Sequence, residues 1–290
     1  MKLIIYLATC NKTSYILPAT IFLYKKFIPN CPLIRVLGFE KPDLPDWENV
    51  EFISLAPVQK NINLWSKYLH DYFLKIDDEL LYFALDDFFP IDYLNQKSYD
   101  FIIDYMQKNK IGNCVVSQEP SSCPKRNEVE AIIKEDEDIF VYKRKKGVCY
   151  QIVLQPCIWN RNYLLKIFKQ ENTPWDLEIK VSSIANKDTE YYNISSSQFP
   201  KEPSKCIIPF STQSSLSSKW GDKISVIGLK SEIVKELIDK KLLDKNKLII
   251  GAWDTYVNWK EDFTKKELKK LIESGPENLN WWLPAYSKYY

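Results

Sequence analysis

Glycine is scarce in this sequence, with only 7 among 290 residues, and histidine occurs once. The glycines form no cluster, so the chain lacks the glycine-rich phosphate-binding loop of P-loop and dinucleotide-binding proteins. An excess of charge of one sign is also missing, because 40 basic residues face 38 acidic ones and leave a net charge of +2. A nucleic-acid-binding protein is typically far more basic. These shortages disfavour three common classes of function.

Paired cysteines and long apolar runs are lacking as well. The seven cysteines are odd in number and show no Cys-x-x-Cys spacing, which argues against a disulfide scaffold or a zinc site and favours free thiols. The apolar run at residues 3–7 is too short for a signal peptide, and no other stretch approaches the length of a membrane span. We expect a cytoplasmic protein, with peripheral contact at the inner face of the membrane as an alternative.

Apolar and aromatic residues are abundant. Hydrophobic residues make up 45% of the chain, and the aromatic 14% includes 9 tryptophans and 18 tyrosines. A chain of this length and composition can bury a thick core as one large domain, or as one domain with a helical appendage.

One stretch organises the rest of the sequence. Residues 80–85 form a short apolar run that ends at two adjacent carboxylates, Asp86 and Asp87. The length and aromatic content of the run predict a buried strand. Ligands of α/β sheets bind at the carboxyl ends of the strands, and hard carboxylate oxygens are preferred by Mg²⁺ and Mn²⁺. The alternative is that the pair only leaves the sheet and caps a helix that begins near Asp92.

Strand and helix patterns alternate through the first 117 residues. Short apolar runs predict strands at residues 2–8, 33–39, 51–55, 80–85 and 113–117. Apolar residues at helical spacing predict helices at residues 16–28, 63–76 and 93–106. This alternation indicates an α/β fold with a mostly parallel sheet covered by helices.

The pattern changes in the second part of the chain. A β-hairpin is predicted from residues 139–143 and 148–154, followed by helices at 161–170 and from Thr173 onward. Residues 195–218 are rich in serine and proline and read as long loops around a short strand near Ile207. Two further helices are predicted at 231–242 and 264–275.

Three motifs follow one another along the chain: LDDFF at residues 85–89, QPCIWNR at 155–161 and TPWDLE at 173–178. This order resembles GT-A-type glycosyltransferases, particularly bacterial enzymes that build capsule, lipooligosaccharide or other surface glycans. The resemblance covers roughly residues 1–220. It implies a GT-A-like (Rossmann-like) catalytic domain at 1–225, with a donor half at 1–118 and an acceptor half at 119–225, and a helical C-terminal extension at 226–290.

The resemblance implies a nucleotide-diphosphate sugar donor, such as a UDP-sugar, with Mn²⁺ or Mg²⁺. The Asp-x-Asp motif of the family maps to residues 85–87, so Asp87 would coordinate the metal and Asp86 would contact the ribose or sugar of the donor. Leu85 departs from the motif, because it occupies the first acidic position. Thr9 and Asn11 would meet the nucleotide base and ribose, although the polarity of a loop explains both residues equally well.

The resemblance also implies a catalytic base in an inverting reaction. The base would be Asp176 or Glu178, and we prefer Asp176. A general base must lie within hydrogen-bond reach of the acceptor hydroxyl. The alternative is that Asp176 only completes a capping box, since it lies three residues after Thr173.

The acceptor would contact Trp159, Arg161 and Trp175. Both tryptophans could stack on sugar rings, while a tryptophan beside the start of a helix is more often part of the core. The expected acceptor is a glycan or a lipid-linked glycan, and no nucleic-acid partner is expected.

The resemblance therefore implies a glycosyltransferase of hexosyltransferase type in the synthesis of a bacterial-type surface polysaccharide. Two alternatives stay open. One is a nucleotidyltransferase, although the loop at residues 9–13 lacks the glycine-rich basic sequence of that class. The other is a non-catalytic carbohydrate-binding protein built on a decayed transferase fold.

Overall fold

The computed structural model describes residues 3–57, 61–118, 129–147, 151–197, 205–212 and 229–244, and every structural statement below refers to them. The chain separates into two compact units, Met1–Pro209 and Phe210–Tyr290. The predicted helix at 264–275 lies outside the described residues. Among the described residues, no helix combines the length and the apolar character needed to cross a bilayer.

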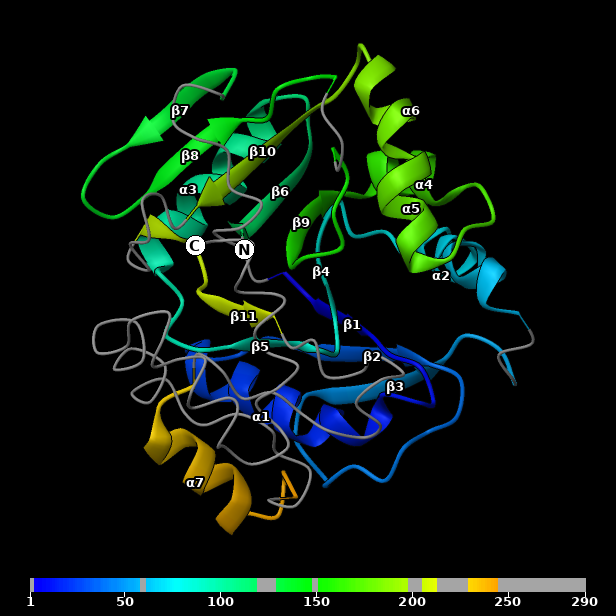
Figure 1. Cartoon of the computed structure of the whole chain (residues 1–290), viewed down its shortest axis with the longest axis vertical. Coiled ribbons are helices and arrows are strands. Elements are labelled where there is room, and N and C mark those ends of the chain that lie inside the picture. Colours follow the sequence, from blue (N-terminus) through cyan, green and yellow to red (C-terminus); the bar gives the residue numbers. More distant parts are fainter. Residues whose placement is uncertain are drawn as a thin grey trace, which may run out of the picture. The chain divides into compact units, whose positions relative to one another are not determined.

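Within the described residues, a nine-stranded sheet forms the centre of the first unit, in the order β3-β2-β1-β4-β9-β6-β10-β8-β7 (Figure 1). Its parallel half consists of β1 (Ile5–Ala8), β2 (Ile34–Gly38), β3 (Val50–Ser54) and β4 (Leu80–Leu85). Its mixed half consists of β6 (Ile111–Gln118), β7 (Ala131–Glu135), β8 (Phe140–Lys143), β9 (Cys157–Asn160) and β10 (Tyr192–Ser197).

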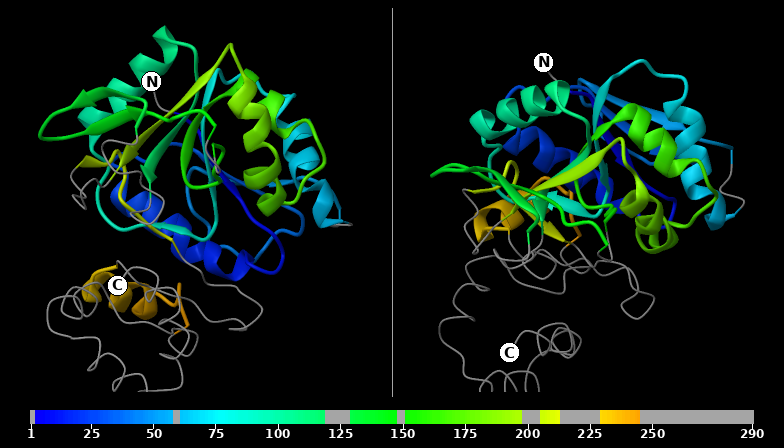
Figure 2. Two further views of the ribbon diagram at one scale, coloured as in Figure 1. Left: turned by 45° about the horizontal axis from the view of Figure 1, so that its top comes forward. Right: turned by 90° about the horizontal axis from the view of Figure 1, so that it is seen from above.

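Helices cover both faces of this sheet (Figure 2). One face carries α1 (Leu17–Phe27) and α3 (Gln96–Lys108), and the other carries α2 (Trp65–Phe73), α4 (Arg161–Phe168), α5 (Pro174–Lys180) and α6 (Ser182–Lys187). Neighbouring residues of β4 show the division, because successive side chains of a strand point to opposite faces. The ring of Tyr82 packs edge-on against Tyr24 of α1, whereas Phe83 packs against Phe73 of α2.

Short elements complete the described chain. They are the 3₁₀ turns η1 (Ser14–Ile16) and η2 (Ile62–Leu64) and strand β5 (Phe88–Pro90) in the first unit, and strand β11 (Phe210–Thr212) and helix α7 (Ser231–Asp239) in the second. Helix α7 lies within the predicted span 231–242 and buries Leu237.

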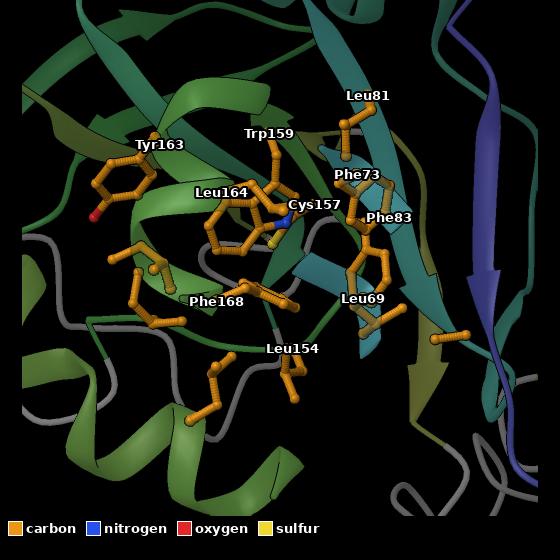
Figure 3. Packing of buried hydrophobic residues seen from close by; sticks show 14 of the residues in the cluster. Leu69, Phe73, Leu81, Phe83, Leu154, Cys157, Trp159, Tyr163, Leu164 and Phe168 are labelled. Carbon is orange, nitrogen blue, oxygen red and sulfur yellow. The ribbon is translucent and has the colours of Figure 1, made fainter. Parts of the chain in front are cut away.

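The aromatic-rich core lies between the sheet and α2, α4 and α5 (Figure 3). Phe83, Trp159 and Phe168 meet there edge to face, with ring centroids about 6 Å apart. Burial of large aromatic side chains supplies much of the hydrophobic stabilisation of such a core. The abundance of aromatic residues in the sequence therefore serves packing in this region.

The strand order contains a topological switch point. The chain runs from β1 through α1 to β2 on one side of β1, and it returns through α2 to place β4 on the other side. Where connections leave in opposite directions, the carboxyl ends of the two strands leave a crevice that α/β proteins use for ligands. In this sheet the switch point lies between the carboxyl ends of β1 and β4.

The prediction of an α/β fold with a mostly parallel central sheet flanked by helices is confirmed for β1 to β4, whereas antiparallel ladders join β4 to β9, β9 to β6, β10 to β8 and β8 to β7. Three local predictions are wrong. Residues 140–143 pair with β7 and β10, and residues 151–154 form no strand. Residues 195–197 belong to β10. Helix α3 begins at Gln96, because the side chain of Asn95, rather than Asp92, accepts the capping hydrogen bond from the Ser98 amide at 3.1 Å.

Candidate active site

Two polar residues directly follow the paired strands of the switch point. Ala8 and Leu85 are partners in the β1–β4 ladder, and Thr9 and Asp86 come next in the chain. The amide of Asp86 continues the ladder by donating to the carbonyl of Ala8 at 3.0 Å. Each strand is apolar and is followed by a polar residue. The pairing of β1 with β4 therefore brings Thr9 and Asp86 together.

Asp86 is fully engaged with the loop that follows β1. Its Oδ2 accepts hydrogen bonds from the hydroxyls of Thr9 and Thr13, each at 2.5 Å, and the side chain is 4% exposed. The Thr20 hydroxyl of α1 donates to the Asp86 carbonyl at 2.6 Å. Asp86 thus fixes the β1–α1 loop, and its contacts in the structure are with protein groups.

A glycine makes room for this arrangement. A Cβ atom on Gly38, the last residue of β2, would lie 2.8 Å from Cγ2 of Thr9 and 3.0 Å from the ring of Phe52. Such a distance is shorter than carbon atoms tolerate, so any side chain at position 38 would displace Thr9. Few glycines occur in the chain, and this one allows a strand to approach the site closely.

Asp87 differs sharply from its neighbour. Its side chain is half-buried, and its Oδ1 is buried without a hydrogen-bond partner among the described residues. Buried polar atoms are nearly always paired in folded proteins, so an exception needs an explanation. A carboxylate oxygen without a partner keeps its capacity to accept a hydrogen bond or to bind a cation.

Burial raises the pKa of both carboxyl groups above the ordinary range. For Asp86, the hydrogen bonds from Thr13 and Thr9 offset part of this increase. For Asp87, the negative charges of Asp86 and Glu178 add to the effect of burial and raise its pKa further. Removal from water and like charges both disfavour ionisation. A positive charge beside the two carboxyl groups would therefore stabilise their ionised forms.

Glu178 of α5 is a further acid, and its negative charge contributes to the raised pKa of Asp87. Its Oε1 accepts a hydrogen bond from the Leu154 amide at 2.6 Å. Burial raises the pKa of Glu178, and the hydrogen bond from the Leu154 amide and the positive charge of Arg144 counteract this increase. A raised pKa makes a carboxylate a stronger proton acceptor.

Asp176 lies at the start of the same helix but makes structural contacts. Its Oδ2 accepts a hydrogen bond from the Thr173 hydroxyl at 3.0 Å, its amide donates to the Thr173 hydroxyl, and its Oδ1 forms an ion pair with Lys180 at 2.8 Å. The hydrogen bonds from Lys180 and Thr173 hold the pKa of Asp176 below its usual value. These contacts match the alternative that Asp176 completes a capping box with Thr173.

The predicted donor residue Asn11 lies in the same loop as Thr9. Its Oδ1 accepts a hydrogen bond from the Glu40 amide at 3.2 Å, and the residue is exposed. It connects the loop after β1 to the segment after β2. The structure thus groups Thr9, Asn11, Asp86 and Asp87 at one edge of the sheet.

The three predicted acceptor residues lie in different places. Trp159 is 0% exposed within the core, so it packs the interior of this structure. Arg161 lies at the opposite end of β4 from the carboxylates, and its guanidinium donates to the carbonyls of Phe73 and Leu74 at 2.9 and 3.0 Å, at the end of α2. These contacts make Arg161 a helix-capping residue. Trp175 on α5 is 69% exposed.

The carboxylates near the end of β4 offer few ligands to a divalent cation. No group of three or more His, Cys, Asp or Glu side chains is placed to hold a metal ion in the part of the chain that the structure describes. Mg²⁺ often takes only one or two carboxylates and fills its shell with water and substrate phosphates. The unpartnered Oδ1 of Asp87 fits one such ligand position.

Thr13 and Thr20 are site residues that the sequence analysis missed. Both hydroxyls hold Asp86, one at its carboxylate and one at its carbonyl. A weak signal was present, because Thr13 lies one helical turn after Thr9 in a short polar segment. Thr20 lies inside an apolar helical pattern, and only the packing of α1 against the end of β4 gives it a role.

No protein-family model matches this chain, and no curated protein matches it. Similar solved structures include a crystal structure of S. aureus TarS 1-349, with 14% identity, a TM-score of 0.39 and coverage of 68% of this chain and 58% of that chain. A second crystal structure of S. aureus TarS has 12% identity, a TM-score of 0.41 and coverage of 68% and 35%. TarS is a glycosyltransferase. This chain therefore spans less than two thirds of either structure, and a TM-score this low assigns neither a family nor an activity.

Proposed function

We propose that this protein is a glycosyltransferase that moves a sugar from a nucleotide-diphosphate donor to a hydroxyl group of a glycan. Asp87 carries the proposal, because its buried Oδ1 has no partner among the described residues and lies at the carboxyl end of β4 beside the switch point. The motif resemblance of the sequence agrees with this placement. The resemblance alone supplies the finer assignment to the GT-A type and to bacterial-type surface polysaccharides.

The proposed donor half consists of Thr9, Asn11, Asp86 and Asp87. Cleavage of the bond between the anomeric carbon and the diphosphate leaves negative charge on the leaving group. When bound, Mn²⁺ or Mg²⁺ would stabilise that charge by electrostatic attraction. Asp87 would hold the cation through its free carboxylate oxygen, and Asp86 would keep the β1–α1 loop in position through the two threonine hydroxyls.

Glu178 is the base that the contacts favour over Asp176. Its charge acts on Asp87, whereas Asp176 is occupied by Thr173 and Lys180. In an inverting transfer, Glu178 would accept the proton of the acceptor hydroxyl while that oxygen forms the bond to the anomeric carbon. The raised pKa of Glu178 suits a group that must accept and later release this proton.

Trp175 is the proposed contact for the acceptor. It is 69% exposed, and Ile179, one helical turn later on α5, is 62% exposed. Residues four apart lie on the same side of a helix, so the two form one apolar surface. Glu178 belongs to the same helix, which links this surface to the proposed base.

The test is the thermal stability of the full chain with UDP and with a panel of UDP-sugars, each with and without Mn²⁺. A ligand that binds the native state raises Tm by mass action, by about 2.7 kcal/mol of stability at one hundred times its Kd. We expect a Mn²⁺-dependent rise that disappears in Asp87→Asn. No rise with any nucleotide would contradict the proposal, and binding without turnover would favour the non-catalytic alternative.

A further inference from the structure

A cavity of about 240 Å³ lies on the sheet face that α1 and α3 cover. Ile5 of β1 and Tyr82 of β4 form part of its wall, and they are partners in the β1–β4 ladder. Ile28 at the end of α1, Leu94 before α3 and Ile208 form further parts of the wall. We refer to the space between these five residues as the α1–α3 cavity. All five belong to the first unit.

The interior of the α1–α3 cavity is apolar. Its five residues are 0–9% exposed, and all but Tyr82 have pure hydrocarbon side chains. The hydroxyl of Tyr82 is paired with the hydroxyl of Tyr24 at 3.3 Å. Water in such a space finds few partners for hydrogen bonds. An apolar ligand that displaces the water therefore gains free energy from its own transfer out of solvent.

The α1–α3 cavity meets solvent at a rim of different character. Pro29, Asn30 and Gln96 line the cavity and are exposed, and Pro32 and Tyr99 are half-buried. Asn30 has a φ of 50°, in the left-handed region, and it turns the chain between the two prolines. The side chains of Asn30 and Gln96 carry amides, which can donate and accept hydrogen bonds. An entering ligand thus meets polar groups at the rim and carbon atoms inside.

Backbone hydrogen bonds hold the wall of the cavity in place. The Leu94 amide donates to the carbonyl of Phe27, in the last turn of α1, at 2.9 Å. The Asn95 amide donates to the carbonyl of Ile207 at 2.9 Å. These two bonds join the start of α3 to the end of α1 and to the segment that contributes Ile208. The cavity is therefore formed before a ligand arrives, which lowers the ordering cost of binding.

The lining selects for the charge and the size of a ligand. Asp, Glu, Lys and Arg are absent from the described residues that line the cavity, so a charged molecule would lose its hydration without gaining a partner. Burial raises the pKa of Tyr99 to about 12, in keeping with apolar surroundings. A cavity of about 150 Å³ can hold benzene. A volume of about 240 Å³ therefore suits one aromatic ring with a small substituent.

We propose that the α1–α3 cavity binds a small neutral aromatic molecule of the phenol class, with its ring among the buried side chains and its hydroxyl at the rim. The ring of Tyr82, which already packs edge-on against Tyr24, offers the same kind of contact to a bound ring. The cavity is separate from the donor site, because Ile5 begins β1 whereas Thr9 follows its last residue. The proposal goes beyond the proposed function and requires neither nucleotide nor sugar.

The chemistry of the ligand is tested with 4-methylphenol, added to the full chain without nucleotide or metal and followed by saturation-transfer NMR. We expect a Kd of about 1 mM, an affinity within reach of a fragment of this size. The comparison ligand is 4-methylbenzoate, which has the same ring but carries a carboxylate. Its affinity should be at least about tenfold lower, because the cavity offers no partner for its charge.

The place of binding is tested with two substitutions that change the cavity in opposite directions. Ile28→Trp fills it and should lower the affinity for 4-methylphenol at least about tenfold. Leu94→Ala enlarges it, so 2-naphthol, which has a second ring, should bind this variant at least about tenfold more tightly than it binds the wild type. The matched controls are Ile132→Trp and Leu74→Ala, which make the same changes at exposed positions and should bind both ligands as the wild type does.

Three outcomes would overturn the proposal. They are the absence of 4-methylphenol binding to the wild type, equal binding of 4-methylbenzoate, and unchanged affinities in Ile28→Trp and Leu94→Ala relative to their controls. The Tm of each variant is measured first, and Leu94→Ala decides alone if the bulky side chain of Ile28→Trp prevents folding. Because the assay contains no nucleotide and no metal, its result is independent of the donor site proposed at Asp87.

Discussion

The two halves of the sheet place their polar groups differently. In the parallel half, β1 and β4 are apolar along most of their length, and the polar residues follow at their carboxyl ends. In the mixed half, Asn113, Asn193 and Ser195 lie within strands β6 and β10 on a buried face. The polar groups of the parallel half follow its strands, whereas those of the mixed half lie within theirs. The comparison separates polar residues at the ends of strands from polar residues packed inside the sheet.

The largest expected effect concerns Asp87, at the carboxyl end of β4. Asp87→Ala should lower turnover of the donor by about 10²–10³, because it removes electrostatic support of the leaving group. Folding should survive, since Oδ1 has no partner to lose among the described residues. The measurement is kcat together with Tm, and the control is Asp77→Ala, an exposed carboxylate before the other end of β4. Unchanged turnover in Asp87→Ala would place the donor site elsewhere.

The next effect compares two acids on one helix. Glu178→Gln should slow transfer by about 10² without weakening donor binding, because it removes a general base but keeps an acceptor for the Leu154 amide. Asp176→Asn should leave transfer intact and lower Tm slightly, because it removes the ion pair with Lys180 and weakens the contact with Thr173. Single-turnover rates and donor affinity separate the two, and the reverse pattern would restore Asp176 as the base.

A third prediction contrasts the neighbouring aspartates. Asp86→Ala should cost about 1–3 kcal/mol of stability, because the Thr9 and Thr13 hydroxyls lose their common acceptor. Asp87→Ala, measured in the same urea titration, should cost less. Unfolding of both variants at the same urea concentration would contradict the claim that the hydrogen bonds of Asp86 stabilise the fold more than the contacts of Asp87 do.

The next prediction concerns Arg161, at the opposite end of β4 from the carboxylates. Arg161→Met keeps much of the side-chain stem but removes the hydrogen bonds to Phe73 and Leu74, so we expect a loss of about 1 kcal/mol of stability. The KM for the acceptor should not change, because the residue lies far along β4 from the carboxylates. An increase in acceptor KM with unchanged stability would return Arg161 to the acceptor site.

The smallest effect concerns pH. Asp86 and Asp87 have pKa values raised above those of the unfolded chain, so the native state binds more protons than the unfolded state. Their contribution to stability is therefore full below about pH 4 and is lost as pH rises through the raised pKa values. Without metal, Tm of the wild type should fall over this interval relative to Asp87→Asn. A difference in Tm between the two proteins that stays constant with pH would argue against the raised pKa of Asp87.

Much of the parallel half could be predicted from the sequence. The apolar run at 80–85 and the helical spacing before it predicted β4 and α2, because buried strands and amphipathic helices leave clear periodic patterns. The grouping of Thr9 with Asp86 followed from the rule that ligand-binding residues follow parallel strands. The capping alternative for Asp176 could also be read from its distance to Thr173.

The mixed half could not be predicted in the same way. The expected hairpin assigned residues 148–154 as the partner of 139–143, yet β8 pairs with β7 and β10. Residues 195–197 look like a loop because they are serines, and they form a strand because β6 and β8 flank them. Such strand pairings join residues that are far apart in the chain, and local sequence patterns do not predict them.

The sequence by itself determined the order of strands and helices in the first half and the position of two carboxylates at a strand end, since both depend on neighbouring residues. The tertiary structure alone decided which carboxylate is free. Thr13 and Thr20 approach Asp86 from α1 and its preceding loop, and they leave Oδ1 of Asp87 without a partner among the described residues. Partner choice depends on distances in space between segments that are remote in sequence, and so does the burial of Asn113, Asn193 and Ser195.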